Sequence, residues 1–222
     1  MSKRALFLCG GWEGHTPRES AEVFAPLLHE SDYEVEIEAS LAPLADRDRL
    51  DETDLVVPVW SMGEISSEQW QALDAAVRAG TGCAGFHGGI LDAFRDSLSF
   101  KWMVGGQFVA HPGNTIPEHR VEVVDREHEI TKGIADFVLP DSEQYYCHVD
   151  PGVHVLCTTT FTGEHGETTL YPADTVMPYA WTRSWGTGRI FAASWGHTWK
   201  DFDVPEAREI VLRGLKWATR GE

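Results

Sequence analysis

The residue with the clearest chemical setting is His87. It lies at the centre of Gly85-Phe86-His87-Gly88-Gly89, where a small-residue strand end runs into paired glycines. This pattern is typical of a sharp strand-to-helix turn, which exposes its central side chain. An imidazole at that place can act as an acid, a base, a nucleophile or a metal ligand. Acyl-enzyme chemistry of the usual kind is excluded, because the central residue is neither Ser nor Cys.

Three further titratable residues are candidates for catalysis. His197 follows an apolar run and the pair Trp195-Gly196, and His111 follows Gly105-Gly106 in a segment without strong periodicity. Glu143 opens a predicted strand over residues 143–149. The predicted catalytic residues are therefore His87, Glu143, His197 and His111.

The same histidines are candidate metal ligands. No pair of them has the i, i+4 spacing of a helical metal motif, so the spacing alone predicts no metal. If His87, His111 and His197 converge with Glu143, their nitrogen and oxygen atoms suit zinc or another divalent ion. The cofactor thus stays open between none and a divalent metal such as zinc.

Aromatic residues suggest what the site could bind. The chain has nine tryptophans, and an indole face can stack on a sugar ring. Most tryptophans belong to a core, but some of these lie at or beyond the ends of predicted strands, where a pocket belongs. The predicted substrate-binding residues are Trp12, Trp60 and Trp195, together with His15, Gly88, Gly89 and Tyr145.

The first half of the chain must position these groups. Apolar runs at 4–9, 54–60 and 82–87 predict buried strands, and residues 33–37 alternate like a strand near a sheet edge. Helical spacing predicts helices over 18–30 and 66–79, and a third from the His87 turn through Phe94. Alternating strands and helices predict a doubly wound, mainly parallel α/β sheet, with ligands beyond the carboxyl ends of the strands.

The second half has a different pattern. Strands are predicted over 120–124, 143–149, 154–161, 177–183 and 189–194, separated by Gly, Pro and Asp turns, before a closing helix over 205–219. No linker or repeat divides the chain. We therefore predict a single domain over residues 1–222, with an antiparallel β extension in its second half.

The amino-acid composition excludes some classes of binding partner. The 222 residues carry a formal net charge of −17 and no basic run, which argues against nucleic acid and against an acidic membrane surface. The start of the chain predicts neither a signal peptide nor a membrane span, so we expect the cytoplasm. Small molecules, including carbohydrates, are the expected ligands, and the oligomeric state stays open between a monomer and a homo-oligomer.

Several motifs in order along the chain resemble those of the ThuA-like family, named for trehalose utilisation. They are Gly10-Gly11-Trp12 with His15, the turn around His87, Gly105-Gly106-Gln107-Phe108 with His111-Pro112, residues 128–133, 141–145 and 186–191, Gly196-His197, and residues 213–218. The resemblance implies a flavodoxin-like fold of the class I glutamine amidotransferase type. That pattern places Cys at the turn where this chain has His87, so the resemblance implies the scaffold without the glutaminase reaction.

Two functions of different class remain. The resemblance implies disaccharide catabolism, and the leading hypothesis is an enzyme acting on a sugar or 3-keto-sugar by His/Glu acid–base or metal-assisted chemistry. The alternative is a carbohydrate-binding or sensing protein that uses the same pocket without catalysis.

Overall fold

A nine-stranded sheet runs through the molecule, in the order β2-β1-β3-β4-β11-β10-β9-β6-β7. The computed structural model describes residues 2–165 and 173–221. Five neighbouring strands are parallel: β2 (Tyr33–Glu38), β1 (Lys3–Gly11), β3 (Leu55–Ser61), β4 (Gly82–Phe86) and β11 (Gly188–Ala193). Their order is that of flavodoxin-like sheets, in which ligands bind beyond the carboxyl ends of the strands.

The other four strands continue the sheet in antiparallel fashion. They are β10 (Thr175–Trp185), β9 (His154–Phe161), β6 (Thr115–Val123) and β7 (Phe137–Glu143). A separate two-stranded sheet pairs β5 (Gly106–Ala110) with β8 (Tyr146–Val149). The predicted antiparallel extension of the second half is thus confirmed.

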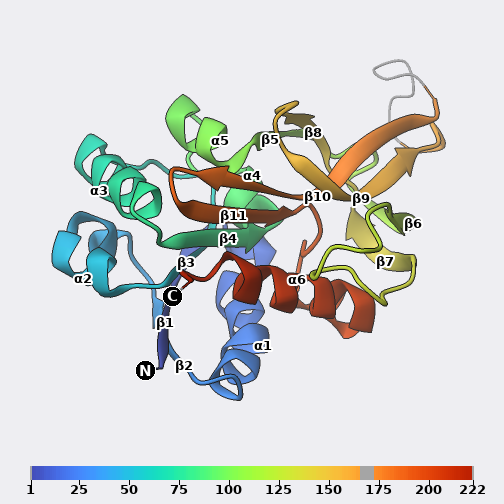
Figure 1. Ribbon diagram of the computed structural model, residues 1–222. Coiled ribbons are helices and arrows are strands. Elements are labelled where there is room, and N and C mark those ends of the chain that lie inside the picture. The colour runs from blue at the N-terminus through green and yellow to red at the C-terminus, as the bar shows by residue number, and fades with distance from the viewer. Residues whose placement is uncertain (1, 166–172, 222) are drawn as a thin grey trace.

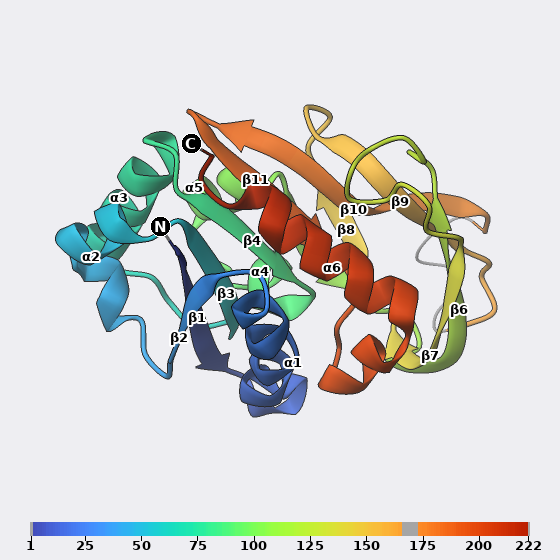
Figure 2. The same ribbon diagram turned by 60° about the horizontal axis from the view of Figure 1, so that its bottom comes forward.

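Helices cover both faces of the parallel strands, as the prediction of a doubly wound sheet requires (Figures 1 and 2). On one face lie α1 (Pro17–His29) and α6 (Pro205–Ala218); on the other lie α3 (Ser67–Arg78), α4 (Gly88–Leu91) and α5 (Leu98–Val104), with α2 (Arg47–Glu52) beside α3. Local sequence starts several of them. Ser66 and Gln69 form a capping box before α3, and a proline opens both α1 and α6. No helix in 2–165 or 173–221 is long and apolar enough to cross a bilayer.

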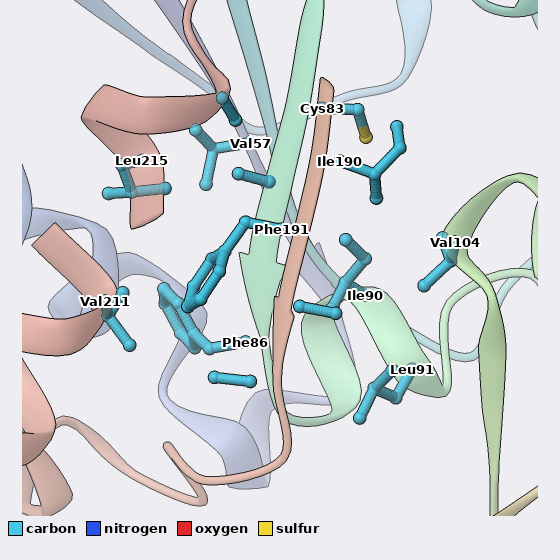
Figure 3. Close-up of a cluster of buried hydrophobic side chains, with 14 of the residues drawn as sticks. Val57, Cys83, Phe86, Ile90, Leu91, Val104, Ile190, Phe191, Val211 and Leu215 are labelled. Carbon is cyan, nitrogen blue, oxygen red and sulfur yellow. The ribbon is translucent and has the colours of Figure 1, made fainter. Parts of the chain in front are cut away.

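The core lies on both sides of β4 and β11 (Figure 3). Val211 and Leu215 of α6 approach these strands from one face, and Ile90 and Leu91 of α4 approach from the other. All four side chains are fully buried. Packing of α4 between the sheet and its neighbours fixes the direction in which the chain leaves β4, which is the turn that carries His87.

Two predicted elements were wrong in their bounds. The helix predicted through Phe94 ends at Leu91, because Ala93 forms a β-bridge with Met62 and Phe94 adopts a φ of +52°, so neither residue continues a right-handed helix. The strand predicted over 143–149 is two strands, β7 ending at Glu143 and β8 starting at Tyr146. Glu143 therefore closes a strand and does not open one. The helices α2 and α5 and the strand β5 were not predicted, and only the last residue of β7, Glu143, falls in a predicted strand.

Candidate functional site

Three imidazoles and one carboxylate meet at one end of the sheet. Each of His15, His87, Glu143 and His197 offers one ligand atom, and these atoms all lie within 4.8 Å of one another. The three histidines follow the carboxyl ends of parallel strands β1, β4 and β11, where a doubly wound sheet places its ligands. Glu143 comes from the antiparallel extension, as the last residue of β7.

His87 sits on a strained turn. Its φ of +47° and ψ of −141° are rare for a residue with a side chain, and its backbone N–H donates to the carbonyl of Ala193. The ring Nδ1 lies 2.9 Å from the carbonyl oxygen of Ser194, so Nδ1 carries the proton. Nε2 then presents its lone pair, 3.2 Å from Oε2 of Glu143. Burial lowers the pKa of His87 to about 3, which keeps the ring neutral.

A serine orients His15 in the same way. Its Nδ1 lies 2.5 Å from Oγ of Ser61, at the end of β3, and its Nε2 lies 3.9 Å from Oε2 of Glu143. Only glycine fits at Gly88, because a Cβ there would come within 2.6 Å of this Nδ1 and 2.7 Å of the Ser61 hydroxyl. Gly88, the first glycine after His87, therefore makes room for His15.

A buried aspartate holds His197 and Glu143 together. Oδ2 of Asp201 accepts hydrogen bonds from the backbone N–H groups of Gly196 and His197, at 2.9 and 3.0 Å. It also accepts one from the hydroxyl of Ser142, at 2.7 Å. Burial raises the pKa of this carboxyl above its usual value. One side chain thus fixes the loop of His197 and the residue next to Glu143.

Glu143 is buried among the imidazoles. Burial on its own would raise the pKa of its carboxyl, but the neighbouring His15, His197 and His87 outweigh that effect and hold the pKa well below its usual range. Its backbone carbonyl accepts a hydrogen bond from the hydroxyl of Tyr179, 3.2 Å away. Both the charge and the position of this carboxylate are set by buried neighbours.

His111 lies just outside this group. Its Nε2 is 3.9 Å from Oε1 of Glu143, on the other side of the carboxylate from the three histidines that share Oε2. About a third of its side chain is exposed. The structure therefore gathers all four predicted catalytic residues, but His15 takes the place in the cluster that the sequence assigns to His111.

The predicted substrate-binding residues differ in exposure. Trp12 is 47% exposed and stands edge-to-face against His15, with ring centres 4.6 Å apart. Trp60 is half-buried over Gly10, and Tyr145 is buried with its ring stacked on His87. Trp195 is fully buried and its Nε1 donates to the carbonyl of Ala207, so this indole has no face open to a sugar. Gly88 and Gly89 are buried as well.

Sequence reasoning missed the residues that orient the site. They are Ser61, Ser194, Tyr179 and Asp201. Ser61 and Ser194 at least lie where strands β3 and β11 end, which is a weak signal. Asp201 follows His197 by four residues in the short helix η3 (Trp199–Asp203), and nothing in its sequence context marks it as buried. Trp199 of η3 is 38% exposed, and its N–H donates to the hydroxyl of Thr16 beside His15.

The fold and this cluster define an α/β protein with a His-rich site at the carboxyl ends of a flavodoxin-like sheet. The profile of the ThuA family, described as trehalose utilisation, matches residues 4–218, and the chain belongs to this family. The resemblance drawn from the motifs is thus confirmed.

Solved structures with this fold include two ThuA-like proteins. The one from Bacteroides uniformis has a TM-score of 0.76 and 20% identity, covering 98% of this chain and 91% of its own. The one from Parabacteroides merdae has a TM-score of 0.74 and 17% identity, with 98% and 90% covered. A cytoplasmic protein of Salmonella typhimurium LT2 has a TM-score of 0.66 and 11% identity, with 98% and 100% covered. Among curated proteins, none matches the chain. At these identities the likeness shows the fold alone.

Proposed function

We propose that this protein acts on a sugar or 3-keto-sugar in disaccharide catabolism, at the site formed by His15, His87, Glu143 and His197. Membership of the ThuA family supports a role in trehalose-related carbohydrate metabolism. The observation that carries the proposal is the convergence of a buried carboxylate with three imidazoles beyond the parallel strands, next to an exposed indole. Such polar groups at this end of the sheet are typical of a small-molecule site.

The site offers two routes for chemistry beside a carbonyl. In the first route His87 and Glu143 supply an imidazole and a carboxylate in contact, two groups that can each take up or release a proton in acid–base catalysis. His111 lies beside the same carboxylate with about a third of its side chain exposed, so it is an imidazole able to pass a proton between substrate and water. In the second route the imidazoles and Glu143 would hold a metal ion, which would supply a Lewis acid for the substrate oxygen.

The glutaminase reaction is not part of this proposal. We infer a scaffold of the class I glutamine amidotransferase type, but His87 occupies the turn where such enzymes carry Cys. The four cysteines at 9, 83, 147 and 157 are buried, and burial raises the pKa of each thiol to about 12. A buried, protonated thiol is a poor nucleophile.

Trp12 is the residue we assign to sugar contact. Its indole is exposed next to His15, and its other neighbour, Gly14, has no side chain to cover the ring: a Cβ there would lie 2.4 Å from the indole. An exposed indole in contact with His15 suits a sugar ring that stacks on it while its polar groups reach the imidazoles.

The test is depletion of candidate sugars. The purified chain is incubated with trehalose, other disaccharides and their 3-keto forms, and each is followed by mass spectrometry. We expect loss of a 3-keto-disaccharide with the wild-type chain and none with His87→Ala. Unchanged turnover by His87→Ala would remove His87 from the mechanism. Binding without depletion in both chains would instead support the non-catalytic carbohydrate-binding protein.

A further inference from the structure

In the four-residue cluster, a nitrogen of each of the three imidazole rings approaches the same oxygen, Oε2 of Glu143. Nδ1 of His87 donates to the carbonyl of Ser194, and Nε2 of the same ring lies 3.2 Å from Oε2 of Glu143. Two acceptors in contact repel each other unless a cation lies between them. A proton on Nε2 would serve one of these ring nitrogens, whereas a metal ion at the same point can bind the three nitrogens and the carboxylate together.

A ring nitrogen of His197 also faces Glu143 without a hydrogen bond. Its Nδ1 lies 3.2 Å from Oε2 of Glu143, but the contact lacks the direction of a hydrogen bond, and this buried nitrogen has no hydrogen-bond partner among the described residues. A buried polar atom without a partner is uncommon in a folded protein. Here the same point in space would satisfy His87, His197 and Glu143 together.

The surroundings of the cluster are those of metal ligands. A ligating imidazole usually donates its other ring N–H to a neighbouring oxygen, which fixes the tautomer. Nδ1 of His87 donates to the carbonyl of Ser194, and Nδ1 of His15 shares a hydrogen bond with the hydroxyl of Ser61. Each ring therefore presents Nε2 toward Glu143. Hydrogen bonds to residues outside the cluster thus occupy Nδ1 of both rings and leave Nε2 for ligation.

The spacing of the donors fits a small divalent ion. Bonds of 2.0–2.2 Å in a tetrahedron separate donor atoms by about 3.3–3.6 Å. The distances from Oε2 of Glu143 to the nitrogens of His87, His197 and His15 are 3.2, 3.2 and 3.9 Å. Three imidazoles and one carboxylate are a donor set suited to zinc and neighbouring first-row ions.

We propose that this protein holds one divalent first-row metal ion, zinc before the others, on Nε2 of His15, Nε2 of His87, Nδ1 of His197 and the carboxylate of Glu143. These ligands differ from those predicted from the sequence, because His15 is a ligand and His111 is not. His111 stays free beside Oε1 of Glu143, next to the ion. The proposal specifies the metal-assisted form of the proposed function and rests on the same site.

The test measures metal binding without measuring activity. The full chain is stripped with a chelator, dialysed against zinc or cobalt(II), and its metal content is determined by mass spectrometry. We expect one ion per chain, an absorption spectrum of tetrahedral cobalt(II), and a melting temperature that rises on loading because the ion binds the folded state. A chain that takes up no zinc and no cobalt, with no change in melting temperature, overturns the proposal.

Two alanine variants test the identity of the ligands. His15→Ala is expected to lower zinc affinity at least 100-fold, whereas His111→Ala, its matched control, keeps one ion per chain. The reverse pattern would overturn the assignment. Should His15→Ala fail to fold, Ser61→Ala takes its place: loss of the tautomer support is expected to weaken zinc binding 10- to 100-fold, and unchanged affinity would contradict it.

The result also separates this proposal from the proposed function. A chain that binds one ion but depletes no sugar leaves the metal centre standing and removes the carbohydrate reaction. A stripped chain that still depletes a 3-keto-disaccharide at its full rate removes the metal and leaves the reaction.

Discussion

The two halves of the sheet contribute to the site in different ways. The parallel half supplies three imidazoles, each directly beyond the end of a buried strand, at β1, β4 and β11. The antiparallel half supplies one carboxylate, Glu143, from a strand at the far edge of the sheet. Strand geometry alone brings the imidazoles together, because the ends of neighbouring parallel strands share one edge. The carboxylate reaches them only through tertiary contacts.

The two halves also differ in the hydrogen bonds that hold their site residues in place. The imidazoles are oriented by backbone and hydroxyl groups of the strand ends, such as Ser61 and the carbonyl of Ser194. Glu143 depends on Tyr179 behind it and on the Asp201–Ser142 pair beside it. The parallel half therefore positions the imidazoles through its strand ends, and the antiparallel half adds the carboxylate that gives the site its negative charge.

Removing the carboxylate should have the largest effect. Glu143→Gln keeps the shape of the side chain but removes its charge, so we expect turnover of the responsive sugar to fall about 10²- to 10⁴-fold. Glu118→Gln, on the exposed face of β6 in the same half, is the matched control and should stay near wild type. If both variants kept full turnover, the antiparallel half would have no part in the chemistry.

Acid should destabilise the antiparallel half through His119. Burial first, and then the nearby His165, lowers the pKa of His119 to about 4, against 6.5 for the free side chain. The unfolded chain therefore takes up this proton first as the pH falls. Stability should decrease from about pH 6.5 down to pH 4, by about 3 kcal/mol for this group.

Urea unfolding of the metal-free chain across that range measures the effect. His119→Gln should flatten the dependence on pH, whereas His29→Gln, which changes an exposed residue of the parallel half, should leave it as it is. Parallel curves for wild type and His119→Gln would show that this histidine does not titrate in the folded state as described.

Asp201 is a positioning residue that joins the halves, and its loss should be felt at the metal. Asp201→Asn keeps the side-chain size but weakens three hydrogen bonds, to Ser142, Gly196 and His197. We expect zinc affinity to fall about 10- to 100-fold, as for other residues that orient metal ligands. Competition with a chromogenic chelator gives the affinity, and the exposed Asp203→Asn is the control. Equal affinity in the two variants would mean that the halves meet without this aspartate.

Two tyrosines give the smallest expected difference between the halves. Tyr179→Phe leaves Nε2 of His119 and the carbonyl of Glu143 without their buried partner, and should cost about 1–3 kcal/mol of unfolding free energy. Tyr33→Phe, at the edge of the parallel half, removes one half-buried hydrogen bond to Thr219 and should cost about 1 kcal/mol or less. Equal costs from chemical denaturation would remove the energetic distinction drawn above.

The same division explains what could be predicted from the sequence. Apolar runs predicted β1, β3, β4 and β11, and the rule for doubly wound sheets then placed His15, His87 and His197 at one edge. The turn at His87 is local, so five residues were enough to predict it. Contacts between residues that lie far apart in the sequence have no comparable local pattern from which to predict them.

The antiparallel half was harder because its contacts are between distant residues. Glu143 was named as a candidate, but its strand was assigned to 143–149, since the break at Gln144 and Tyr145 has no Gly or Pro to mark it. Trp195 was assigned to a pocket because it follows β11, yet it packs beneath α6. The replacement of His111 by His15 in the cluster also depends on which oxygen of Glu143 each ring faces, and no sequence pattern encodes that.

The most direct test of the account is a crystal structure of the zinc-loaded chain with anomalous data collected at the zinc edge. The account predicts one strong peak about 2.0–2.2 Å from Nε2 of His15, Nε2 of His87, Nδ1 of His197 and a carboxylate oxygen of Glu143. A peak bound to His111 in place of His15, or no peak among these four residues, would contradict it.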